Sequence, residues 1–527
     1  MMRHRFGGGL LQGWAVLQGW TVSVLCCCAV ALPAAAQTSK STERIALPED
    51  VNPIAYELEV TPDAAHLRFA GKERVLLQVQ KATRAITLNA ADLTLQQITV
   101  VADSGAAGSA RKLTPQVALD QERQTATFTL AEDLQPGRYW LELTYEGKIF
   151  QQASGLFALD YDGPQNTKKR ALFTQFENSD ARRFLPCWDE PARKATFQLS
   201  VVVPEGETAV SNMPVEGSKV LGSGRTRVQF ARTPKMSSYL LFLATGDFER
   251  IHQTVGKADV GVVFTRGNAL KARFALQTAV ELLPYYNEYF GSTYPLPKLD
   301  LIAAPGLSQF FSAMENWGAI LFFEHVLLVD PRVTTAADRQ EDYVVIAHEM
   351  AHQWFGDLVT MAWWDDLWLN EGFASWMENK AVDHFHPEWK PWVQFSAGVQ
   401  HAMRLDAARG THPVVTPIQD VLQASTAFDT ITYSKGAAVV RMLEDYAGED
   451  AFRNGVRAYI RKYAYANSRT DDLWSAVDQA SPRKITTIAH DFTLQAGVPL
   501  IRIERTSCEG GRQNTSLSQG RFALDDS

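Results

Sequence analysis

The sequence is poor in cysteine. It has five cysteines in 527 residues, and three of them, Cys26, Cys27 and Cys28, fall in the first 36 residues. Only Cys187 and Cys508 lie further along the chain, far apart from each other. A small secreted protein held together by disulfides has an even set of closely spaced cysteines, so this class is excluded. We expect Cys187 and Cys508 to be unpaired thiols rather than a disulfide.

The sequence also lacks a basic block, an internal repeat and a low-complexity tract. Its 59 acidic residues and 51 lysines and arginines give a formal net charge of −8. Nucleic acids are bound through clustered positive charge, so we do not expect a nucleic acid partner. The length is enough for two or more domains.

The first 36 residues have the pattern of a signal peptide. Arg3, His4 and Arg5 form a positive start, residues 10–32 are mostly apolar, and three alanines at 34–36 fit a cleavage site. The apolar stretch is almost long enough for an uncleaved membrane anchor. Its glycine and glutamine interruptions and the alanines favour cleavage. The sequence therefore predicts an exported protein, periplasmic or secreted, with no stable membrane insertion after cleavage.

The remaining chain changes its pattern from β to α. From about 45 to 250, strand-like alternation is interrupted by Pro and Gly turns, which favours an antiparallel, sandwich-like β domain. From about 270 to 495 the period is helical, as in Leu270–Tyr289 and Ala437–Tyr446. Strand-like alternation returns after Val498.

These patterns predict a multidomain α+β protein. The predicted parts are the signal peptide, an N-terminal antiparallel β domain, a mostly helical domain and a strand-like final segment, at residues 1–36, 37–250, 251–495 and 496–527.

The chemistry of the chain is concentrated in residues 343–376, where His348-Glu349-x-x-His352 is followed by Glu371. Residues i and i+4 of a helix share one face, so both imidazoles can point at one metal ion. Glu349 is turned off that face and can reach a water beside the metal without being a ligand. We assign Glu371, on the next helix, as the third ligand, which leaves the fourth position of a zinc ion open for that water.

Local signals predict helices at both places. Asp338–Phe355 has no Pro or Gly, carries acids near its start and stops at Gly356, which suits a left-handed cap. The second helix is predicted to begin near Asp365 or Asp366 and to end before Pro387. The five-residue motif alone is also compatible with a buried helix whose histidines are satisfied in the core.

Seven segments together resemble the gluzincin zinc aminopeptidases of the aminopeptidase N type, which include the puromycin-sensitive and endoplasmic-reticulum aminopeptidases. The resemblance runs from about residue 45 to the end, and the segments have the order and spacing of the family. They are Thr174-Gln175-Phe176-Glu177, Asp180-Ala181-Arg182-Arg183, Pro186-Cys187-Trp188-Asp189-Glu190-Pro191, Ala313-Met314-Glu315-Asn316-Trp317-Gly318, His348-Glu349-Met350-Ala351-His352, Trp368-Leu369-Asn370-Glu371-Gly372 and Tyr433-Ser434-Lys435-Gly436.

The resemblance implies a β N-terminal domain, a thermolysin-like catalytic domain and the start of a β-sandwich. It implies one zinc ion per chain, held by His348, His352 and Glu371. The implied reaction is hydrolysis of the N-terminal peptide bond by a zinc-activated water, with Glu349 as general base and Tyr433 stabilising the oxyanion.

The resemblance also implies a site for peptides with a free amino terminus. Glu315 would hold the terminal amine, and Gln175 and Glu177 would line the first side-chain pocket and help to hold the amine. The segment from Ser312 through Ala313 and Met314 to Asn316 would lie along the substrate.

Two departures from the family remain. The family usually has Gly where this chain has Ser312, which loses the freedom of glycine at positive φ, and we expect modified rather than abolished activity. Family members also continue well beyond residue 527, so the chain is expected to stop inside a third domain. Alternative functions are a catalytically impaired peptide-binding fragment and a related epoxide hydrolase. The oligomeric state is left open.

Overall fold

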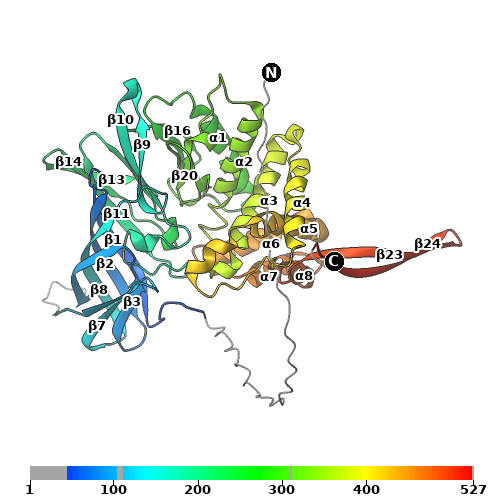
Figure 1. The fold of residues 1–527 in the computed structure, drawn as a ribbon, viewed down its shortest axis with the longest axis horizontal. Helices are drawn as coiled ribbons and strands as arrows, with labels where there is room; N and C mark the ends of the chain where they lie inside the picture. Colours follow the sequence, from blue (N-terminus) through cyan, green and yellow to red (C-terminus); the bar gives the residue numbers. More distant parts are fainter. Residues whose placement is uncertain (1–43, 104–110, 309–310, 525–527) are drawn as a thin grey trace, which may run out of the picture. The chain divides into compact units, whose positions relative to one another are not determined.

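The computed structural model describes residues 44–103, 111–308 and 311–524. In these residues an N-terminal β region precedes a region that is mainly helical, and the chain ends on a long hairpin (Figure 1). The predicted fold class, a β-rich domain followed by a mostly helical domain, is confirmed. The predicted boundaries at residues 250 and 495 stay a prediction.

The N-terminal β region is built from three sheets. The eight-stranded sheet has the order β13 (Val215–Gly222), β14 (Arg225–Phe230), β11 (Thr196–Pro204), β1 (Val51–Asp63), β2 (Arg68–Val79), β8 (Gly137–Lys148), β4 (Leu93–Ala102) and β5 (Lys112–Leu113). The four-stranded sheet is β12 (Thr208–Ser211), β15 (Leu243–Gly246), β10 (Lys168–Gln175) and β9 (Gly155–Asp162). The third contains β3 (Thr83–Asn89), β7 (Thr125–Leu134) and β6 (Gln116–Asp120).

One strand pair of this region departs from the predicted antiparallel arrangement. Strand β1 pairs with β11 in parallel, with Ala55 opposite Thr196 and Val60 opposite Val201. The period of two along a strand encodes which residues face the core, but it carries no information about the direction of the neighbouring strand. The tertiary fold therefore decided this direction.

A five-stranded sheet begins at Phe248 and extends into the region predicted to be helical from residue 270. Its order is β16 (Phe248–Val255), β17 (Ala258–Thr265), β18 (Lys298–Ala304), β20 (Ala319–Phe323) and β19 (Ala313–Met314). Strands β17, β18 and β20 run parallel to one another, and every residue of β18 and β20 is buried. Strands buried on both faces read as short apolar runs without alternation, which is why the sequence did not reveal them.

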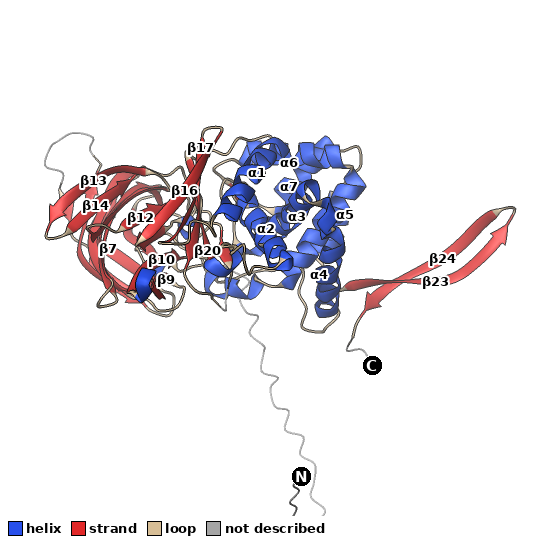
Figure 2. Cartoon of the chain, turned by 90° about the horizontal axis from the view of Figure 1, so that it is seen from above, coloured by secondary structure: helices blue, strands red, loops and turns tan. Residues whose placement is uncertain are grey.

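The described residues contain eight α-helices. Figure 2 shows the helices in blue, gathered beside the β region. They are α1 (Arg273–Phe290), α2 (Ala336–Ala351), α3 (Trp368–Phe385), α4 (Pro391–Asp406), α5 (Gly436–Ala447), α6 (Glu449–Tyr463), α7 (Thr470–Ala480) and α8 (Thr486–Thr493). Helix α3 packs against α2, α4 and α5, and nearly all of its first half is buried. It is the central helix of this region.

Helix α2 differs from its prediction at both ends. It begins after Thr335, whose hydroxyl accepts from the Asp338 backbone while the Asp338 carboxylate accepts from the Thr335 backbone. It ends at Ala351 rather than at residue 355. The reciprocal cap satisfies two free helix donors and fixes the start earlier than the run of acids suggested.

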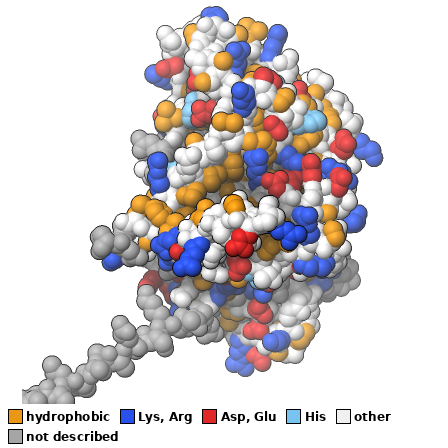
Figure 3. Space-filling view, turned by 90° about the vertical axis from the view of Figure 1, so that its right-hand side faces the viewer, with side chains coloured by type: hydrophobic (Ala, Val, Ile, Leu, Met, Phe, Trp, Pro, Cys, Tyr) orange, Lys and Arg blue, Asp and Glu red, His pale blue; other side chains and the backbone are white. Residues whose placement is uncertain are grey.

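The final described segment is a two-stranded hairpin of β23 (Val498–Glu509) and β24 (Arg512–Phe522). It projects from the helical region in both ribbon views (Figures 1 and 2). Figure 3 shows the side of the molecule from which the hairpin projects, and hydrophobic side chains gather in a hollow there. A cavity of about 240 Å³ lies between α4, α5, α8 and the start of β23.

The two cysteines beyond the predicted signal peptide are both free. Cys187 is buried in the N-terminal β region, and Cys508 is exposed near the tip of the hairpin. The expectation of two unpaired thiols is confirmed.

Candidate metal centre and active site

The three predicted metal ligands converge between helices α2 and α3. His348 and His352 stand one turn apart at the end of α2, and Glu371 lies in the first turn of α3. The Nε2 atoms of the two histidines are 3.1 Å apart, and Glu371 Oε2 is 3.3 Å from His348 Nε2 and 3.4 Å from His352 Nε2. Ligands that surround a tetrahedral zinc ion at 2.0–2.1 Å lie about 3.3 Å from one another, so this donor set fits zinc.

Two further groups orient the histidines. His348 Nδ1 is 2.6 Å from Glu378 Oε2, and His352 Nδ1 is 2.9 Å from the carbonyl oxygen of Phe355. Each contact leaves the Nε2 atom of the ring free to face the metal position. Glu378 was not predicted from the sequence, although it lies two turns after Glu371 on α3, and that spacing could have indicated it.

Electrostatics hold Glu371 ionised. Burial opposes its ionisation, but the attraction of His352 and the hydrogen bond with His348 outweigh burial and lower its pKa to about 2. The pKa of His352 is raised instead. Burial lowers this pKa, but the nearby carboxylates of Glu315 and Glu371 raise it by a larger amount, so that it is about 9. A metal ligand must be deprotonated, so metal binding by these histidines would release protons and depend on pH.

Glu349 lies beside the ligands without belonging to their group of three. Its side chain is 7% exposed, and its Oε2 has no hydrogen-bond partner in the described part of the protein. The pKa of Glu349 is raised to about 8, mainly by burial and also by the neighbouring carboxylate of Glu315. The histidines His348 and His352 act in the opposite direction and lower this pKa. A buried carboxyl group with a raised pKa is suited to exchange protons near neutral pH.

The segment from Ala313 to Gly318 is fastened to the end of α2. Gln353 donates through Nε2 to the carbonyl oxygen of Glu315 at 3.0 Å, and its Oε1 accepts from the Gly318 backbone at 3.0 Å. This contact brings Glu315 to the centre, where its carboxylate lies within 4.8 Å of ligand atoms of Glu349 and His352. Gln353 follows His352 directly, but nothing in the sequence indicated this clamp.

The other predicted residues of this segment lie in different surroundings. Met314 and Asn316 are buried, and Ala313 is half-buried. Neither polar atom of the Asn316 side chain has a hydrogen-bond partner among the described residues. Ser312 is exposed and is not among the residues with a positive φ, so the predicted loss of glycine-like freedom has no basis here.

Gln175 and Glu177 approach the centre from the N-terminal β region. Gln175 is the last residue of β10 and is buried, while Glu177 follows two residues later. Burial raises the pKa of Glu177 well above its usual range, and repulsion from Glu315 and then Glu371 adds to the rise. The two regions thus contribute carboxylates to the same acidic pocket.

Tyr433 reaches the centre from a five-residue π-helix, η8 (Ile431–Lys435). Its ring stacks on His348 with centroids 6.1 Å apart. Burial raises its pKa well above the usual value, and Glu371 and Glu177 add to the rise, so the hydroxyl keeps its proton. Gly372 and Gly436 permit this approach, because a Cβ on Gly372 would lie 3.2 Å from Gly436 Cα.

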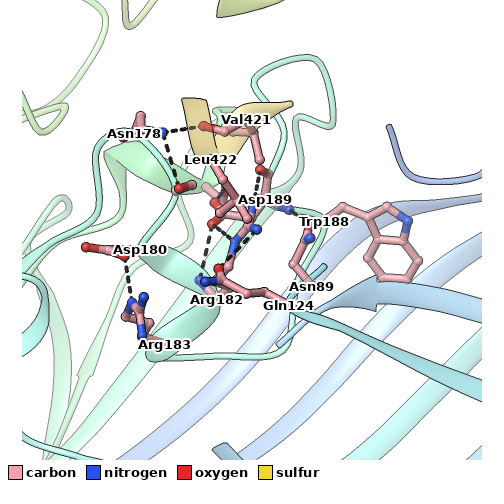
Figure 4. A network of polar contacts seen from close by, with 12 residues as sticks. Asn89, Gln124, Asn178, Asp180, Arg182, Arg183, Trp188, Asp189, Val421 and Leu422 are labelled. Atoms are coloured by element: carbon pink, nitrogen blue, oxygen red, sulfur yellow. Dashed lines mark hydrogen bonds and ion pairs between the residues drawn. The ribbon is translucent and has the colours of Figure 1, made fainter. Parts of the chain in front are cut away.

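Two motifs singled out in the sequence lie outside the metal centre. Arg182 and Asp189, from the Asp180 and Pro186 motifs, form a buried ion pair with Arg182 Nε 3.0 Å from Asp189 Oδ2 (Figure 4). In the same view Asn178 donates to the carbonyl oxygen of Val421, 2.7 Å away, in the helical region. These contacts hold the chain that follows Gln175 and Glu177, which is a positioning role.

Two comparisons with known proteins agree with this geometry. Residues 52–240 match the description "Peptidase M1 N-terminal domain", and residues 274–492 match "Peptidase family M1 domain". Similar proteins include aminopeptidase M1-D of Oryza sativa subsp. japonica, 38% identical over 483 residues, which are 91% of this chain and 53% of the relative.

Relatives from other organisms give the same result. The puromycin-sensitive aminopeptidase of Caenorhabditis elegans is 35% identical over 482 residues, 91% of this chain and 50% of the relative. "Aminopeptidase 2, mitochondrial" of Saccharomyces cerevisiae is 34% identical over 490 residues, 92% of this chain and 50% of the relative. The chain spans about half the length of the curated relatives it matches.

These relatives contradict the predicted export of the protein. They are plant, worm and yeast aminopeptidases, one is named as mitochondrial, and none of their names describes a secreted protein. The predicted signal peptide, residues 1–36, lies outside the described residues. In the residues that the structure describes, no helix is both long and apolar enough to cross a membrane.

Proposed function

Because this chain belongs to the peptidase M1 family, we propose that it is a zinc-dependent aminopeptidase that removes residues from the free amino terminus of peptides. One observation carries the proposal. The Nε2 atoms of His348 and His352 and a carboxylate oxygen of Glu371 meet at 3.1–3.4 Å, beside the further carboxylates Glu315 and Glu349.

His348, His352 and Glu371 would hold the zinc ion, one per chain. When bound, zinc supplies a Lewis acid that polarises the substrate carbonyl group and makes water a better nucleophile at neutral pH. Glu378 and the Phe355 carbonyl keep both rings in the orientation that this requires.

Glu349 would act as the general base and then as the general acid. It would take a proton from the attacking water and deliver it to the leaving nitrogen of the amide. Its burial supports both steps, because burial raises its pKa to about 8, which makes it a stronger base than an exposed carboxylate. A cation beside it would lower this pKa towards neutrality.

Tyr433 would stabilise the oxyanion that forms as water adds to the carbonyl carbon. Its hydroxyl stays protonated because burial and the nearby carboxylates raise its pKa, so it can donate a hydrogen bond. One such donor is typically worth about 3–4 kcal/mol of transition-state stabilisation.

Glu315 and Glu177 would select a free amino terminus. Burial and mutual repulsion raise the pKa of Glu177, and Oε1 of each side chain has no partner in the described structure. A substrate ammonium group would offset this buried negative charge, whereas an internal peptide bond would leave it without a counter-ion. Gln175 and Met314 would line the pocket for the first side chain.

The test is hydrolysis of alanyl- and leucyl-p-nitroanilide by zinc-loaded protein, with N-acetylated versions of both substrates as controls. We expect hydrolysis of the free-amine substrates only, one zinc per chain, and a fall in kcat of about 10²–10⁴-fold in Glu349→Gln.

Three results would contradict the proposal. Cleavage of the acetylated substrates would argue against recognition of the amine. Hydrolysis that persists in Glu349→Gln would argue against the general base. Folded, zinc-containing protein that cleaves neither substrate would favour a catalytically impaired peptide-binding protein.

A further inference from the structure

A second group of potential metal ligands adjoins the first. Ligand atoms of Glu315, Glu349 and His352 all lie within 4.8 Å of one another, and all three residues are buried. The first group, His348, His352 and Glu371, shares His352 with it. The two groups therefore describe two neighbouring cation positions that meet at one imidazole.

His352 can serve only one of these positions. Its Nδ1 is occupied by the Phe355 carbonyl at 2.9 Å, and its Nε2 faces His348 Nε2 at 3.1 Å and Glu371 Oε2 at 3.4 Å. The imidazole therefore belongs to the zinc position. A cation at the second position would be bound by the carboxylates alone.

These carboxylates have oxygens without partners. Glu315 is 3% exposed and Glu349 7% exposed, and Glu315 Oε1 and Glu349 Oε2 make no hydrogen bond in the described structure. Glu177 Oε1, whose carboxylate interacts with both, is also shielded and unpartnered. Burying a carboxylate oxygen without a partner costs free energy, and a bound cation offsets this cost best because it pairs with the negative charge.

The number of carboxylates at the site leads to the same conclusion. The first group takes one carboxylate, that of Glu371, as a metal ligand. The carboxylates of Glu315 and Glu349 lie in the second group, and Glu177 interacts electrostatically with both. These remaining carboxylates can bind either a divalent cation or the ammonium group of a substrate.

We propose that Glu315 and Glu349, assisted by Glu177, bind a second divalent cation through oxygen ligands, and that this cation competes with the amino terminus of the peptide. This inference rests on the proposed function, because it assumes zinc at the first position. It adds regulation of the same site by the concentration of a divalent metal ion.

The donor atoms indicate the class of cation. Carboxylate oxygens and water are preferred by Mg²⁺, Ca²⁺ and Mn²⁺, whereas the histidine-containing first position suits zinc. Mn²⁺ is the most informative probe of this class because it is paramagnetic. Zinc binds more tightly than Mn²⁺ in the usual order of divalent metals, so Mn²⁺ does not displace it from the first position.

Competition has a specific kinetic consequence. The second cation and the substrate ammonium need the same carboxylates, so Mn²⁺ raises KM and leaves kcat unchanged. Conversely, an amine ligand such as L-leucinamide weakens Mn²⁺ binding, whereas N-acetyl-L-leucinamide, which has no cationic amine, does not.

The experiment is a titration of the zinc-loaded protein with Mn²⁺, followed by electron paramagnetic resonance. We expect one Mn²⁺ per chain, displaced by L-leucinamide but not by its acetylated form. Glu315→Gln and Glu349→Gln should each weaken the binding at least about tenfold, since even indirect partners of a metal change its affinity by this factor. Glu388→Gln, at an exposed carboxylate, should leave it unchanged.

Separate results overturn the inference and the proposed function. Zinc analysis of the same samples tests the first position alone. One zinc per chain without Mn²⁺ binding, or Mn²⁺ binding that survives in both Gln variants, overturns the second position only. Loss of zinc itself from the unsubstituted protein overturns the proposed function, and circular dichroism identifies any variant that fails to fold.

Discussion

At the scale of single residues, Tyr433 gives a direct test of the proposed chemistry. Its ring stacks on His348 with centroids 6.1 Å apart, and a hydrogen bond with Glu371 is among the interactions that raise the pKa of its hydroxyl. We predict that Tyr433→Phe lowers kcat about 10²–10³-fold, because one oxyanion donor is lost, while zinc content and KM stay nearly constant. Steady-state kinetics with leucyl-p-nitroanilide measures this.

The matched control is Tyr465→Phe, which removes a hydroxyl group from an exposed tyrosine. It should leave kcat unchanged. An equal fall in both variants would show that the loss of kcat comes from the fold, and an unchanged kcat in Tyr433→Phe would exclude the oxyanion role.

Lys194 gives a pH-dependent prediction. It is buried, its Nζ lies 3.4 Å from the backbone oxygen of Asp357, and burial lowers its pKa from 10.5 to about 7. Between these two values the unfolded chain binds more protons than the folded chain. The contribution of Lys194 to the free energy of unfolding therefore rises with pH, by up to about 1.4 kcal/mol per unit.

Urea unfolding at pH 7, 8 and 9 checks this contribution. The rise should be smaller in Lys194→Met than in the unsubstituted protein. Lys380→Met is the matched control, because acidic partners raise rather than lower the pKa of Lys380. A pH dependence that is identical in all three proteins would show that Lys194 is not strained by its burial.

The residues of the centre differ in how far the sequence could predict them. Glu371 could be assigned because its distance from His352 along the chain is a signal in itself. Lys194 and Gln353 carried no such signal, because a buried lysine or glutamine has the same local sequence as an exposed one. Their positions depend on contacts between segments that are far apart in the chain.

At the scale of elements, the segment that follows β10 depends on one buried ion pair. The side chains of Arg182 and Asp189 are each 1% exposed. The Asp189 carboxylate also accepts hydrogen bonds from the Ser238 hydroxyl and from the backbone N–H of Arg182. We predict that Arg182→Met lowers the free energy of unfolding by about 3–5 kcal/mol, because Asp189 is left buried without its partner. Equilibrium unfolding in urea measures this loss.

Arg183→Met is the control, because it breaks the neighbouring ion pair between Arg183 and Asp180. Arg183 binds Asp180 at 2.8 Å, but both side chains are about one quarter exposed, so we expect a loss of less than about 1 kcal/mol. If both variants lowered the free energy of unfolding by a similar amount, the result would contradict the larger contribution that we assign to the buried ion pair.

The elements themselves were predicted with unequal success. Helix α3 (Trp368–Phe385) lies within its predicted limits, because the aspartates before it and Pro387 after it are local signals. Strand β18 was missed, because a strand that is buried on both faces has no alternation. The predicted length of α2 was wrong at its end, where the chain leaves the helix after Ala351 and turns toward the centre.

At the scale of the whole molecule, the terminal hairpin exposes apolar side chains. Ile503 is 71% exposed and Leu517 60% exposed, and they face each other across the pair of strands. Both edges of the hairpin are free of strand partners in the described structure. We predict that the chain self-associates at high concentration and that Ile503→Lys with Leu517→Lys reduces this association, as measured by light scattering.

The control for added charge is Ser507→Lys, at an exposed polar position of the same strand. It should reduce association less than the double variant. Equal effects would indicate general charge repulsion instead of the removal of an apolar surface.

The sequence by itself determined the order of the β and α regions and the family, and it predicted the group His348, His352 and Glu371 that the structure brings together. These features depend on spacing along the chain, such as one helical turn between His348 and His352, and on patterns that a single segment carries. The tertiary structure alone decided the parallel pairing of β1 with β11, the Gln353 clamp on Glu315, and the meeting of Glu177 with Glu315. Each joins segments remote in sequence, where packing and charge act across space and leave no local pattern.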